Sequence, residues 1–118
     1  MNIVTLLVGK TEPEQEREIE KFLNEDANNR SFYKGFYEAA CKSLDKHRNV
    51  AQARNQLDSE GWAIQEGCFS ILFKIASYSV CKKMITPNQY LNISSETRTQ
   101  MNRAHYSSRI RVSKKQRA

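Results

Sequence analysis

Cysteine, histidine and serine are the residue types in this sequence that could act as a nucleophile beside a base. Cys41 stands near His47 in the chain, and Ser107 stands near His105. Nucleophilic catalysis also needs a third residue that orients the base and amides that stabilise the developing charge. The sequence offers neither a nucleophile elbow nor a third member. We therefore predict no catalytic residues and a protein that is not an enzyme.

A metal site would draw on the same side chains, because zinc prefers four cysteine or histidine ligands in a tetrahedron. None of the close ligand pairs that such sites use is present among Cys41, His47, Cys68 and Cys81. Small apolar core residues are the simpler interpretation of these cysteines. The four glycines are scattered singly, so no phosphate-binding loop is formed either. We predict no metal and no cofactor.

The carboxyl-terminal segment carries the strongest functional signal. From Arg98 to the end there are seven basic residues and no acidic one, a net charge of +7. Guanidinium groups bind phosphate oxygens in pairs, and an interleaved ring can stack on a base. We therefore predict binding to DNA or RNA. The predicted binding residues are Arg98, Arg103, His105, Tyr106, Arg109, Arg111, Lys114, Lys115 and Arg117.

Other interpretations of this segment remain open. An acidic protein or nucleoprotein surface would attract the same charges, and a solvated tail would need no partner. Residues 86–103 also fit a small helix-turn-helix, with residues 87–91 as first helix, 92–94 as turn and Glu96 onward as recognition helix. In that arrangement Arg98 would contact phosphates or bases. The first helix would be about one turn too short, and Asn92 stands where such turns often have glycine.

The opposite charge is concentrated near the amino terminus. Between Glu12 and Asp26 seven acidic side chains stand against two basic ones, a net charge of −5. A row of glutamates can imitate a phosphate backbone or bind a basic groove of another protein. It could also pair with the basic segment of a second copy, which would give a homodimer.

Helices are predicted to position these charges. Thr11, Pro13 and Glu14 form a helix-start pattern in which Glu14 returns to the cap, so a surface helix is expected over residues 12–24. Ser31 is predicted to cap a second helix whose apolar residues recur every three or four positions. A shorter helix is expected to begin near Val50.

Residues 62–85 contain most of the apolar side chains. Alternating Phe69, Ile71, Phe73 and Ile75 would suit a strand, whereas polar Glu66, Ser70, Lys74 and Ser77 draw one stripe along a helix. The apolar run from Cys68 to Ile85 is also too long for a typical strand. We favour a central buried helix.

Shorter elements are predicted at both ends. Branched residues over 3–8 indicate a short strand. Thr86, Pro87 and Gln89 form a second capping pattern and predict a short helix to about Leu91. A last helix is expected over residues 96–106, capped by Ser94 or Ser95.

Together these patterns predict a mainly α fold, a small helical bundle around a central buried helix with one short N-terminal strand. One helical domain is expected over residues 1–106 and a flexible basic tail over residues 107–118. The longest apolar stretch is interrupted by polar residues and is too short to cross a bilayer. The sequence shows no export signal, and an odd number of cysteines argues against a disulfide framework. We predict no membrane contact and a cytoplasmic location with reduced thiols.

The functional expectation is a small non-enzymatic regulatory or accessory protein, of the kind that phages and other mobile elements encode. It would bind nucleic acid through its basic C-terminal segment. The alternative is a protein inhibitor or adaptor that binds a larger host protein or nucleoprotein complex and modulates it.

Overall fold

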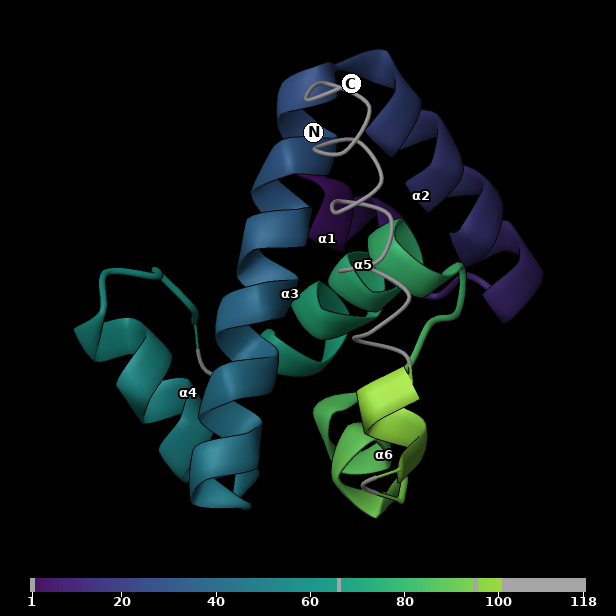
Figure 1. The fold of residues 1–118 in the computed structure, drawn as a ribbon. Coiled ribbons are helices and arrows are strands. Elements are labelled where there is room, and N and C mark those ends of the chain that lie inside the picture. The colour runs from purple at the N-terminus through teal and green to yellow at the C-terminus, as the bar shows by residue number, and fades with distance from the viewer. Residues whose placement is uncertain (1, 66, 95, 101–118) are drawn as a thin grey trace, which may run out of the picture.

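The computed structural model describes residues 2–65, 67–94 and 96–100, and every regular element in these ranges is a helix (Figure 1). The predicted mainly α fold is therefore confirmed. None of these helices combines the length and the apolar character that crossing a bilayer requires. The elements are α1 (Ile3–Leu7), α2 (Glu12–Glu25), α3 (Ala27–His47), α4 (Val50–Ser59), α5 (Phe69–Cys81) and α6 (Pro87–Asn92), and residues 96–100 are also helical.

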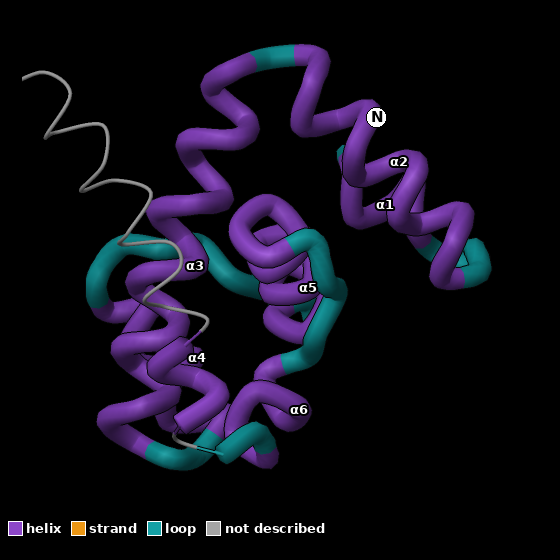
Figure 2. Tube along the Cα trace, turned by 45° about the vertical axis from the view of Figure 1, so that its right-hand side comes forward, coloured by secondary structure: helices purple, strands orange, loops and turns teal. Residues whose placement is uncertain are grey.

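Two helices organise the bundle. The longest helix, α3, packs against α2, α4, α5 and α6, while α5 also contacts α2 and α6 and lies in the middle of the molecule (Figure 2). Phe73 and Ile75 of α5 are completely buried. Burial of each such side chain contributes roughly 1.5–3 kcal/mol to folding. The predicted central buried helix is confirmed.

The course of α5 also explains the ambiguous pattern of its sequence. Phe69, Phe73 and Ala76 recur at helical spacing and are all buried, whereas Ile71 is only half-buried, so the apparent alternation does not mark a strand face. One detail of the predicted polar stripe is wrong, because Ser77 is buried. Its Oγ donates to the carbonyl of Lys74 and accepts from the amide of Ile85, so both its hydrogen-bonding roles are filled inside the protein.

The predicted strand over residues 3–8 is wrong, because residues 3–7 form α1. Asn2 caps this helix by accepting a hydrogen bond from the amide of Val4. Ile3 and Leu7, one turn apart, are the two buried side chains. A lone strand would leave its amides and carbonyls without ladder partners, since the described residues contain no other strand. A helical turn satisfies these groups locally.

Two predicted capping details are also corrected. Thr11 caps α2 as expected, but Glu14 accepts a hydrogen bond from the Thr11 hydroxyl in place of its backbone amide. The cap of α3 is Asp26, which accepts from the amide of Asn28, so the helix begins four residues before Ser31. An aspartate acceptor at that position is a strong N-cap.

The end of the described chain follows the predicted pattern. Thr86 and Gln89 form the reciprocal capping box of α6, with Pro87 at its first position. The boundary predicted at residue 106 and the tail predicted over residues 107–118 lie outside the described residues and stay predictions.

Candidate nucleic-acid interface

Of the nine predicted binding residues, Arg98 is the one that the described part of the chain contains. The other eight lie within residues 101–118. This range, here called the basic segment, carries six basic residues and no acidic one. The structure therefore shows how the basic segment is joined to the helical body.

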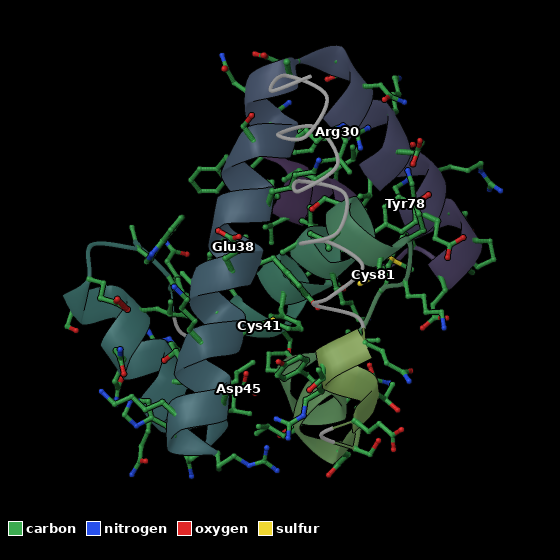
Figure 3. The ribbon with its side chains drawn as sticks, viewed as in Figure 1. Arg30, Glu38, Cys41, Asp45, Tyr78 and Cys81 are labelled. Carbon is green, nitrogen blue, oxygen red and sulfur yellow. The ribbon has the colours of Figure 1, made fainter. Side chains whose placement is uncertain are left out.

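Arg98 is held by the body at the point where the basic segment begins. Its Nη1 donates to Oδ1 of Asp45 at 2.7 Å, and its guanidinium lies over the ring of Tyr90, 5.5 Å from the centroid. The Tyr90 hydroxyl donates to the same carboxylate at 3.2 and 3.3 Å. Figure 3 shows Asp45 on the lower half of α3, near the α6 region. One carboxylate thus joins α3, α6 and the final helical residues.

Local sequence explains why Arg98 reaches this place. Ser94 starts the final helical residues, because its Oγ accepts from the amide of Thr97 at 3.2 Å, as predicted for one of the two serines. The amide of Arg98 then donates to the carbonyl of Ser94, which closes the first turn. Tyr90, completely buried, supplies the ring on which the guanidinium packs.

This placement changes the role open to Arg98. Only 7% of the residue is exposed, so binding phosphate would require the guanidinium to leave Asp45 and Tyr90. In the recognition helix that the helix-turn-helix prediction would require, Thr97 and Gln100 are exposed, whereas Arg98 is buried against the body. The structure therefore makes Arg98 an anchor for the basic segment.

Exposed cations lie close to Asp45 along the chain. Lys42 and Lys46 are one turn apart, and Arg48 follows directly after the helix. Asp45 is the only acidic residue between Lys42 and Arg48, and Arg98 neutralises it. Sequence reasoning did not select these three cations, although the spacing of Lys42 and Lys46 within one predicted helix was a readable signal.

The charge of this surface is modest without the basic segment. Glu38 and Glu60 line the same groove between α3 and α4 as Lys42 and Lys46. Lysines in the last turns of a helix also interact favourably with the helix dipole, which gives them a structural role. The described residues alone therefore form only a weakly positive surface around Lys42 and Lys46.

The residues considered for catalysis are not brought together. Cys41 is buried beside the hydroxyl of Tyr37, and burial raises the pKa of its thiol to about 12. His47 forms a hydrogen bond through Nε2 with Oε1 of Gln56 on α4. A protonated, buried thiol is a poor nucleophile. Cys81, labelled in Figure 3, also lies near Tyr37, its Sγ 3.9 Å from the Tyr37 hydroxyl, and burial raises the pKa of its thiol too.

Potential metal ligands are equally dispersed. Within residues 2–65, 67–94 and 96–100, no three histidine, cysteine, aspartate or glutamate side chains lie close enough to hold an ion.

Comparisons with protein-family models, with curated proteins and with solved structures find no match to this chain. The functional argument therefore depends on its own residues.

Proposed function

We propose that this chain is a non-enzymatic accessory protein of the cytoplasm, of the kind found in phages and other mobile elements, that binds DNA or RNA through its basic segment. The observation that carries the proposal is the anchor of Arg98 on Asp45 and Tyr90. It neutralises the one acidic residue that the sequence has between Lys42 and Arg48, and it holds the chain at residue 98, shortly before the six basic residues of the basic segment begin.

Electrostatics supports nucleic acid as the partner of this region. Each phosphate contact by lysine or arginine releases condensed counterions, so affinity accumulates with the number of contacts. Six basic residues within eighteen positions that include no acidic residue suit a polyanion better than a single acidic side chain. The acidic outer face of α2, with Glu12, Glu16 and Glu25 exposed, would keep the opposite end of the protein away from the phosphates.

The test uses two full-length triple variants with the same change of net charge. Arg103, Arg109 and Arg111 are replaced by glutamine in the first variant, and Lys10, Arg17 and Lys21 of the α1–α2 region in the second. Binding to labelled duplex DNA and to RNA is then measured by fluorescence anisotropy. The first variant should lose at least about ten-fold in affinity and the second should change little.

Equal losses in both variants would show that net charge alone matters and would refute the assigned interface. No binding by the unaltered protein at low salt would refute the function itself.

The alternative, an inhibitor or adaptor for a larger host protein, draws support from apolar exposure. Val8 and Phe32 are large apolar side chains that remain mostly exposed. Such side chains often contribute to protein contacts. Capture of a defined stoichiometric partner from nuclease-treated lysate, lost on replacing Phe32 by serine, would favour this alternative over nucleic-acid binding.

A further inference from the structure

An aromatic groove lies along the amino-terminal half of α3, whereas the anchor is on the carboxyl-terminal half of this helix. Its volume is about 470 Å³, within the range of sites that hold small ligands. It is formed by α1, the first half of α3, the loop before α5 and α5 itself (Figure 1). Its chemistry is set by two kinds of side chain: the rings of Phe32, Phe36 and Trp62, and the uncharged polar groups of Asn2, Thr5 and Gln65.

The rings form a connected wall. Phe32 lies 5.5 Å from Trp62 between ring centroids, and Phe36 lies 5.4 Å from the same indole. Phe32 is 54% exposed although it contacts two other rings, which is unusual for so large an apolar side chain. About half of the Phe32 surface is therefore available to a visiting group.

The loop that carries Trp62 is firmly attached to α4. The amide of Trp62 donates to the carbonyl of Leu57 at 3.0 Å, and Arg54 Nη2 donates to the carbonyl of Ile64 at 2.9 Å. Gly61 has a φ of +101°, a conformation that a side chain would strain. These contacts hold the indole in position before any ligand arrives, which lowers the ordering cost of binding.

The lining favours a nucleobase over a charged group. Among the residues that the structure describes, those that line the groove are all uncharged. Amide and hydroxyl groups can donate to and accept from the edges of a base, while rings stack on its face. A base inside a duplex presents neither its face nor its pairing edge, so the groove would select an unpaired base.

Charge on the same helix supports this occupant. Lys42 and Lys46 stand ten and fourteen residues after Phe32 on α3, roughly 15–20 Å along its axis. Since each residue of an α-helix adds about 100° of rotation, both lysines lie within 120° of Phe32 around the helix axis. A strand with one base in the groove would therefore lead its phosphates toward these lysines, although Glu38 and Glu60 reduce the local attraction.

We propose that the groove of Phe32, Phe36 and Trp62 binds an unpaired base, so that this protein binds single-stranded nucleic acid more tightly than duplex. This inference rests on the proposed function and narrows its ligand class. Trp62 is the sole tryptophan of the chain, so its fluorescence reports on the groove.

The experiment titrates the full chain with a short oligothymidylate, with a duplex of the same length and with an apolar peptide, following both Trp62 emission and anisotropy. The oligothymidylate should quench Trp62, whereas duplex and peptide should not. Phe32→Ala and Phe32→Leu should each weaken single-strand binding about ten-fold, because one stacked base is lost, and leave duplex binding within about two-fold. Phe32→Tyr should retain the affinity.

Val8→Ala is the matched control, since it removes an exposed apolar side chain outside the groove. Binding of the oligothymidylate without quenching, and without loss in Phe32→Ala, would overturn the groove inference and leave the proposed function intact. Quenching by the peptide alone would overturn it in favour of a protein partner. Absence of any nucleic-acid binding would overturn both proposals.

Discussion

Replacement of Asp45 by asparagine should detach the final helical residues from the body. Asparagine keeps the shape of the side chain but removes the negative charge that pairs with Arg98. Arg98 is only 7% exposed, so solvent cannot readily replace this partner. A hydrogen bond to a charged group contributes about 1.5–3 kcal/mol. The Asp45 side chain is 46% exposed, and solvent screening reduces this value. We expect a loss of about 2 kcal/mol in the free energy of unfolding.

A double-mutant cycle with Arg98→Met isolates the interaction from other effects of each change. Methionine can still pack on the ring of Tyr90, so the cycle mainly reports the ion pair. Urea denaturation followed by circular dichroism gives the four free energies. With a slope of about 1–3 kcal/mol per molar urea, the Asp45→Asn midpoint should fall by roughly 1 M. The coupling energy should be about 1–1.5 kcal/mol.

The exposed pair of Lys82 and Glu20 is the matched control. Their contact is longer, at 3.2 Å, and the cation Lys82 has a side chain that is 57% exposed whereas that of Arg98 is 9% exposed, so their coupling should be smaller. A coupling between Asp45 and Arg98 no larger than that of the control would refute the anchor.

Three further predictions concern the body. Phe73→Asp should prevent folding, since it places a charge at a completely buried position, and the helical circular dichroism signal should be lost. Thr86→Ala should lower the unfolding free energy in urea by about 1 kcal/mol, because the α6 capping box loses its acceptor; a change near zero would contradict it. The folded pKa of the Cys41 thiol, about 12, lies above its ordinary value of 9.0. Between pH 9 and 12 the unfolded chain therefore binds fewer protons, and stability should fall as pH rises, by up to roughly 4 kcal/mol, with a shallower fall in Cys41→Ala.

Local patterns were enough to predict most helices. The capping box of Thr86 and Gln89, the start of α2 at Thr11 and the spacing of apolar residues in α3 are encoded within a few neighbouring positions. The central position of α5 was also predictable, because so apolar a segment has to be covered by other helices.

The errors arose where tertiary contacts decide the outcome. Residues 3–7 have branched side chains that suit a strand, but a strand needs a partner, and none is found in the described ranges. Ser77 resembles a surface residue in sequence, yet the amide of Ile85 is within its reach only after the chain turns back from α5.

Arg98 is the clearest case for the candidate interface. Sequence alone groups it with the other arginines, because its charge is the same. Its partner, Asp45, is fifty-three positions away, and Tyr90 contacts both of them only in the folded bundle. The aromatic groove was not predictable for the same reason, since Phe32 and Trp62 meet only through the loop after α4.

The salt dependence of nucleic-acid binding tests the central claim most directly. For duplex DNA, the logarithm of the association constant of the full chain should fall linearly with the logarithm of salt concentration, with a slope of about −5 if the six basic residues of the basic segment each contact one phosphate. Replacing Arg103, Arg109 and Arg111 by glutamine should reduce that slope by about 3. A slope near zero, or one unchanged by the three substitutions, would contradict the account.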